Sequence, residues 1–184
     1  MIKELTDLSP AEVLLIENPD VKIDTLARVT FFDLLLKETL EIIPNPKATT
    51  EEKKNPIIKI GKAYNSYQPL KHETIFLSIF SKDNMLQISL SSLLKTAFEK
   101  VKNSEHYKLK YVYTDERMST YFKSNFFQKL LGIRVMTKEG IHAQNEIKRA
   151  LRRIKINASR KTKNAVELLV AIRGNIVLIP KIPA

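Results

Sequence analysis

The pattern of apolar and polar residues near the start of the chain predicts a capped helix. Ser9, Pro10 and Glu12 provide an N-cap, a proline in the first turn and a capping-box partner. The apolar run that follows continues the helix through Ile16, and we expect the helix to end at Asn18, because a proline comes next.

A second helix is predicted to start at Asp24. Its apolar residues recur at steps of three and four, so one stripe is expected to face a core. The stripe comprises Leu26, Val29, Phe32, Leu35 and Leu36. Two β-prone runs, 40–43 and 57–60, flank a polar, proline-rich loop at 44–56. Helix, helix, strand, long turn and strand is the order of a winged-helix unit, in which the hairpin is the wing.

A similar order of elements is predicted in the rest of the chain. Helices are expected at 70–80, at 90–101 behind a cap at Ser89 or a neighbouring serine, and at 114–131. A short strand at 133–136 precedes a long helix that Thr137 caps and that runs to about Lys155. A short helix at 164–172 and an extended segment at 176–179 complete the chain. The predicted fold class is mainly α with short β-hairpins, either as two winged-helix-like halves (1–68 and 69–184) or as one fused helical domain.

Composition places this chain among ordinary globular proteins. Of its 184 residues, 43% are hydrophobic and 28% are charged, which argues against wholesale disorder. Cysteine is absent from the sequence, so disulfides and thiolate metal sites are excluded. The acidic first residues lack a signal-peptide pattern, and no apolar run approaches the ~18 residues that a membrane span needs. We therefore expect a cytoplasmic protein.

Charge is distributed unevenly along the sequence. Residues 1–50 contain 5 Lys and Arg against 9 Asp and Glu, whereas residues 151–184 contain 8 against 1. The whole chain has a net charge of +11. Such a gradient from an acidic start to a basic end indicates a polyanionic partner on one side of the molecule.

The densest group of cations falls on the predicted long helix and just after it. Positions 148, 152 and 155 align along a helix, with 149 and 153 beside them, while Ile147, Leu151 and Ile154 form the opposite, buried face. Two interpretations are open: a solvated helix face in a basic protein, or a surface that contacts phosphates. The candidate polyanion-binding residues are Lys148, Arg149, Arg152, Arg153, Lys155, Arg160, Lys161 and Lys163.

Other residue types give little indication of catalysis. The run 106–113 (HYKLKYVY) alternates tyrosine and lysine as a strand would, and we expect its rings to pack. His72, His106 and His142 lack metal-ligand spacing, and His72 is expected on the surface at a helix start. Adjacent acidic pairs do not converge on a helix, and four glycines provide no phosphate-cradling loop. The sequence thus predicts no enzyme activity, metal or cofactor.

Four segments together resemble the Golgi phosphoprotein three family and its bacterial relatives. They are LLI (14–16), ARVTFFDLLLKETLEI (27–42), FFQKLLGIRVMTKEG (126–140) and NAVELLVAIRG (164–174). The resemblance implies binding of acidic phosphoinositide headgroups. This chain has no tryptophan and no counterpart of the family's Pro-Thr-Gly-Asp segment, so no family site residue is carried over. The segment RVMTKEGIHAQ (134–144) also resembles the junction between wing and helix in winged-helix transcription regulators, which implies DNA binding.

Three functions therefore remain in view. The first, slightly preferred because winged-helix elements bind nucleic acid more often than membranes, is a DNA-binding module whose helix is flanked by the 43–57 hairpin. The residues best placed to read DNA would be Arg117, Lys123 and Lys129, which precede Arg134 in the sequence. The second is a peripheral adaptor on anionic membranes, with apolar contacts from 176–179. The third is a protein-interaction subunit, with a protein partner at the acidic N-terminal half.

Overall fold

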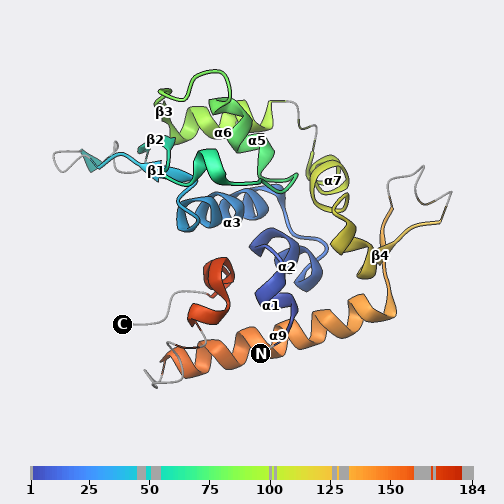
Figure 1. Cartoon of the computed structure of the whole chain (residues 1–184). Coiled ribbons are helices and arrows are strands. Elements are labelled where there is room, and N and C mark those ends of the chain that lie inside the picture. The colour runs from blue at the N-terminus through green and yellow to red at the C-terminus, as the bar shows by residue number, and fades with distance from the viewer. Residues whose placement is uncertain are drawn as a thin grey trace.

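The computed structural model describes residues 2–44, 49–50, 55–99, 101, 103–125, 128, 133–159, 167 and 169–179. The protein is mainly helical, with two small antiparallel sheets, as the sequence predicts. Helices α1 and α2 lie between the long helix α9 on one side and α3 on the other, and α5 and α6 lie beyond α3 (Figure 1). The α-helices span Glu4–Asp7 (α1), Pro10–Glu17 (α2), Ile23–Leu36 (α3), Thr74–Leu77 (α5), Leu90–Phe98 (α6), Ser104–Tyr107 (α7) and Lys138–Ser159 (α9).

The predicted capping box starts α2. Ser9 Oγ accepts a hydrogen bond from the Glu12 amide, and the Glu12 carboxylate accepts one from the Ser9 amide. The predicted stripe of α3 is partly wrong, because Phe32 and Leu36 are 46% and 55% exposed. The helix packs against α2 and the C-terminal segment, and in this orientation Leu34 is buried instead.

The first sheet has the order β1–β2–β3. The predicted hairpin is present: β1 (Leu40–Ile42) pairs antiparallel with β2 (Ile57–Ile60), and Leu40 lies opposite Ile60. The sequence did not indicate β3 (Ile88–Ser89), which pairs with the other edge of β2 and leads directly into α6. Ser89 caps α6 as expected, by accepting a hydrogen bond from the Ser92 amide.

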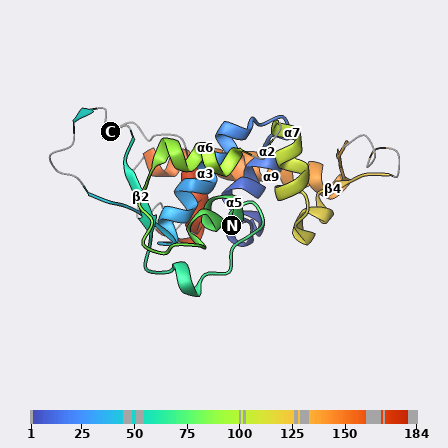
Figure 2. The same ribbon diagram turned by 90° about the horizontal axis from the view of Figure 1, so that it is seen from above.

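Two predictions in the middle of the chain are wrong. The run 106–113 is not strand-like: α7 continues into a π-helical turn, η3 (Lys108–Val112). Its rings pack as expected, because Tyr107 is buried and Tyr111 and Tyr113 lie against the core. The described part of the segment 114–131 is not one helix either. A 3₁₀ turn, η4 (Glu116–Thr120), leads into β4 (Phe122–Lys123), which pairs with β5 (Val135–Met136). The two hairpins lie at opposite ends of the molecule, as both views show (Figures 1 and 2).

The C-terminal segment folds back on the start of the chain. Positions 167 and 169–171 are helical, and the remainder of the predicted helix 164–172 lies outside the described residues. The extended segment expected at 176–179 is mostly a 3₁₀ helix, η5 (Arg173–Leu178), because its residues pack on α2 and α3 and do not join a sheet. Two further 3₁₀ turns are η1 (Tyr64–Ser66) and η2 (Ser78–Phe80).

One apolar cluster runs through the described residues. It combines buried side chains from residues 1–68, such as Leu15 and Leu34, with buried side chains from residues 69–184, such as Phe76, Ile147 and Ile172. A helix precedes a hairpin in each part of the chain, and the winged-helix assignment of these segments stays a prediction. Among the described helices, none combines the length and the apolar character that crossing a membrane requires.

Candidate functional site

One face of α9 fixes this helix against α2. Of the predicted inner face, Ile147 and Ile154 are buried and Leu151 is partly buried, and Ala143 is buried as well. Between them, Gln144 Nε2 donates hydrogen bonds to the carbonyl oxygens of Ile16 (3.2 Å) and Glu17 (3.1 Å). These carbonyls belong to the last turn of α2, whose acceptors need partners outside the helix. The polar contact and the apolar stripe together determine which side of α9 faces outward.

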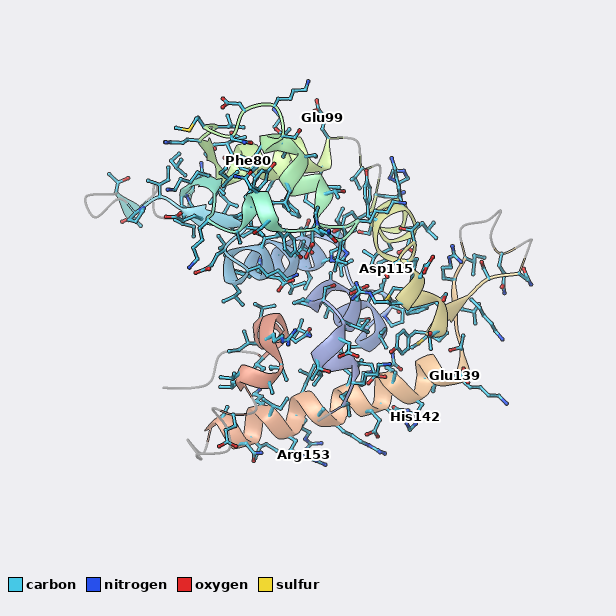
Figure 3. All side chains as sticks on the ribbon, in the orientation of Figure 1. Phe80, Glu99, Asp115, Glu139, His142 and Arg153 are labelled. Carbon is cyan, nitrogen blue, oxygen red and sulfur yellow. The ribbon has the colours of Figure 1, made fainter. Side chains whose placement is uncertain are left out.

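The structure brings five of the eight predicted cations together on this outward side. Lys148, Arg149, Arg152, Arg153 and Lys155 are all exposed. Figure 3 shows Arg153 projecting away from the body of the protein. The other three candidates, Arg160, Lys161 and Lys163, lie outside the described residues.

The five cations cover a broad arc of the helix surface. At 100° per residue, Arg149 and Arg152 lie near its centre, Lys148 and Lys155 lie together on one flank, and Arg153 lies on the other. The rise of α9 places about 10 Å between the two lysines along the helix axis. Arg149 Nη1 forms an ion pair with Glu146 at 3.0 Å, and Glu146 is the single acidic residue between 140 and 159. The face therefore keeps a strong positive charge.

The β4–β5 hairpin adjoins the N-terminal end of α9 and adds further cations. Lys123 of β4 is exposed, and Arg134, just before β5, donates a hydrogen bond to Ser124 Oγ at 2.9 Å. Lys138 is the first, exposed residue of α9. The hairpin beside the basic helix is thus the second one in the chain, and the 43–57 hairpin expected to flank it lies at the other end of the molecule (Figure 1). Lys129, another expected reader, lies outside the described residues.

Arg117, also expected to read DNA, is engaged within the protein. Its Nη2 lies 2.9 Å from Glu12 Oε1, its Nε lies 3.0 Å from Asp115 Oδ1, and Nη1 donates to the carbonyl oxygen of Asp7. Hydrogen bonding to Arg117 lowers the pKa of Asp115, and burial raises the pKa of Glu12 despite its cationic partner. Since this arginine joins two distant segments, its role is structural.

A hollow of about 290 Å³ lies at the edge of the basic face. Leucines from three elements line it: Leu14 of α2, Leu151 of α9 and Leu178 of η5. Arg152 and Lys155 of α9 also line the hollow, together with Glu17 of α2. Sequence reasoning missed this feature, because the three leucines are far apart along the chain.

A second cleft, of about 210 Å³, is lined by Asp33, Lys37 and Tyr67, which form a polar network with the buried Glu73. Lys37 Nζ lies 2.7 Å from Asp33 Oδ2, 2.7 Å from Glu73 Oε1 and 2.9 Å from Tyr67 Oη. Burial alone would lower the pKa of Lys37, but Glu73 and Asp33 raise it above its ordinary value. Burial raises the pKa of Asp33. All three protons of Lys37 are used within the network, so this lysine has no donor left for a ligand.

His72 is buried, contrary to the expectation that it lies on the surface. Its side chain lies against α2, with Nε2 3.1 Å from Ser9 Oγ, and the residue is 1% exposed. Ser9 Oγ also donates a hydrogen bond to Glu12 Oε2 at 2.8 Å. His72 Nδ1 has no hydrogen-bond partner in the described part of the chain, so the pair lacks the orienting acid of a catalytic triad. We interpret this contact as part of the N-terminal cap of α2.

Metal-binding groups are not assembled in the residues that the structure describes: no three His, Asp or Glu side chains there are placed to hold an ion. Comparison with protein-family models, with curated proteins and with solved structures found no match for this chain. The features of this chain that bear on its function are therefore the α9 surface and its surroundings.

Proposed function

We propose that this protein is a non-enzymatic module that binds the phosphate backbone of nucleic acid, first of all duplex DNA, through the outward face of α9. The observation that carries the proposal is the arrangement of Lys148, Arg149, Arg152, Arg153 and Lys155 on one exposed helix face. The inner face of the same helix is held by apolar packing and by Gln144. The cations are therefore presented by a fixed element.

Electrostatics supports a phosphate-rich partner. Like charges three or four residues apart on a helix repel each other by a few tenths of a kcal/mol per pair. Within α9, the Arg149–Glu146 ion pair offsets part of this repulsion. Phosphate groups would relieve this repulsion and would release counterions from the DNA. Five phosphate contacts predict a slope of log K against log salt of about −4.5.

The dimensions of a surface helix suit the same partner. An α-helix with its side chains is about 10–12 Å wide, which the major groove of about 12 Å accepts. Lys148 and Lys155, on one flank of the helix, would face the phosphates of one strand, and Arg153 would face the opposite strand. Lys123 and Arg134, in the adjoining hairpin, extend the contact along the duplex.

A salt titration of binding to duplex DNA tests the proposal. For the wild type we expect a slope of about −4.5 from the five cations of α9, and a steeper one with the contacts from Lys123 and Arg134. The triple variant Arg149→Glu, Arg152→Glu and Arg153→Glu should lower the affinity, and its slope should be shallower by about 3 because three phosphate contacts are removed. A thermal melt checks that the variant stays folded.

A matched variant controls for net charge. Lys71→Glu, Lys82→Glu and Lys95→Glu change the charge by the same amount at exposed positions near α5 and α6, on the side of the molecule remote from α9 (Figure 1). This variant should retain most of the affinity. Equal losses in the two triple variants would contradict a defined DNA surface on α9.

Anionic membrane is the second candidate, and the exposure of Ile156 favours it. This side chain is 44% exposed in the last turns of α9, close to Arg152 and Arg153. Apolar residues beside cations are typical of peripheral membrane contacts, and each cation near an anionic surface contributes about 1 kcal/mol. Co-sedimentation with anionic liposomes at matched ionic strength separates the candidates. Liposome binding that survives competing DNA would favour the membrane, and binding to neither partner would favour a protein partner.

A further inference from the structure

The leucine-lined hollow beside α9 exposes apolar surface that the core does not use. Leu14 is the partly exposed apolar residue of α2, whereas its neighbours Val13 and Leu15 are buried. Leu151 is likewise less buried than Ile147 and Ile154 of the same helix. Together with Leu178, these side chains form an apolar floor that remains open to solvent. Covering that floor with an apolar group would be favourable.

Charged residues line the same hollow, and two of the three are cations. Arg152 has no ion-pair partner among the described residues, and Lys155 lies one helical turn further along α9. Glu17 supplies the one negative charge among the described residues of the lining. An apolar floor with convergent cations is complementary to a molecule that has an alkyl chain and an anionic head.

We propose that this hollow binds a single-chain amphiphile, with its alkyl chain on Leu14, Leu151 and Leu178 and its phosphate or carboxylate head on Arg152 and Lys155. The ligand enters as a single molecule, one per protein. This site goes beyond the proposed nucleic-acid function and shares only Arg152 and Lys155 with it. Its apolar floor has no role in phosphate-backbone binding, so the two proposals can fail separately.

Titration calorimetry with alkyl phosphates below their aggregation concentration tests the proposal. The probes are hexyl, octyl and decyl phosphate, with octanol and inorganic phosphate as the head-free and chain-free controls. Burial of each added methylene should tighten the Kd about fourfold until the hollow is filled. Octanol and inorganic phosphate should each bind more weakly than octyl phosphate. A Kd independent of chain length, or binding only when the probe is part of a vesicle, would overturn the proposal.

Substitutions at the edge of the hollow provide a second test that does not depend on damaging the fold. Glu17→Gln removes the negative charge in the lining and should tighten octyl phosphate binding severalfold. Glu146→Gln removes the same charge from the outward face of α9 and should leave octyl phosphate binding unchanged. If both variants bind octyl phosphate with wild-type affinity, the hollow does not receive the anionic head.

A third variant separates the two sites. Leu178→Gln makes the floor polar at a partly exposed position, so the dependence on chain length should disappear while DNA affinity stays at the wild-type value. Replacing Arg149 and Arg153 should instead abolish DNA binding and leave the dependence on chain length unchanged. That result would show that DNA binds to a surface separate from the hollow. An unchanged chain-length dependence in Leu178→Gln would count against the hollow.

Discussion

At the scale of single residues, burial of His72 predicts how stability depends on pH. Burial lowers its pKa from 6.5 to about 4, so between these values the unfolded chain binds a proton that the native protein does not. Stability contributed by neutral His72 is complete above pH 6.5 and falls as the pH decreases towards 4. The shift corresponds to about 3 kcal/mol. Denaturant unfolding at pH 7 and pH 4.5 should show a smaller loss for His72→Gln than for the wild type.

The comparison isolates His72 because other groups are present in both proteins. Burial raises the pKa of Glu12 and of Asp33, so these carboxyls act in the opposite direction and gain stability as the pH falls. His142, exposed on α9, offers the matched substitution His142→Gln, which removes a histidine elsewhere in the protein and leaves His72 in place. An identical pH dependence for His72→Gln and the wild type would show that the imidazole is not held neutral.

Side-chain roles were predictable where they depend on near neighbours. The outward position of Lys148, Arg149, Arg152, Arg153 and Lys155 follows from helical spacing alone, and the structure confirms it. Contacts between distant residues gave no such signal. Ser9 and His72 are 63 residues apart, and Arg117 is 105 residues from Glu12. No sequence pattern indicates contacts between residues so far apart. Arg117 was therefore interpreted as a cation available to contact DNA.

At the scale of elements, local capping signals decided which predictions succeeded. Ser9 and Ser89 begin α2 and α6 as expected, because each cap involves residues three positions apart. The segment 114–131 has no comparable signal, and aromatic and apolar residues suit a helix or a strand equally well. Pairing of Phe122 with Met136 favours the strand, and that pairing depends on a chain reversal that spacing does not indicate.

Thr137 joins the second hairpin to α9, and its removal should weaken both elements. Its Oγ1 accepts a hydrogen bond from the Gly140 amide at 2.9 Å and donates one to the Thr120 carbonyl at 2.7 Å. Thr137→Ala should lower the free energy of unfolding by about 1 kcal/mol, measured by denaturant titration. Thr137→Ser keeps the hydroxyl and should lose much less. Equal losses would indicate that the methyl group matters and the cap does not.

At the scale of the whole molecule, the end of the described chain is fastened to its beginning. Asn175 Nδ2 donates hydrogen bonds to the carbonyl oxygens of Leu5 (3.1 Å) and Leu8 (2.8 Å). Arg173 has a φ of 50°, in the left-handed region, and the next residue, Gly174, lies against Asp33 of α3. Through these contacts η5 completes the leucine-lined hollow, so the proposed amphiphile site depends on the closure of the chain.

Gly174 permits this closure because any larger side chain would meet Asp33. A Cβ at this position would collide with Asp33 Oδ1 and would lie 3.5 Å from Pro10 Cγ. Gly174→Ala should therefore lower the free energy of unfolding by about 1–3 kcal/mol, as overpacking of a tight contact does. The same substitution in an Asp33→Ala background should cost much less, because the colliding carboxylate is gone. Denaturant titrations of the four proteins measure this coupling. Equal costs in the two backgrounds would mean that η5 is not docked on α3 at this point, and the hollow beside α9 would then lack one of its walls.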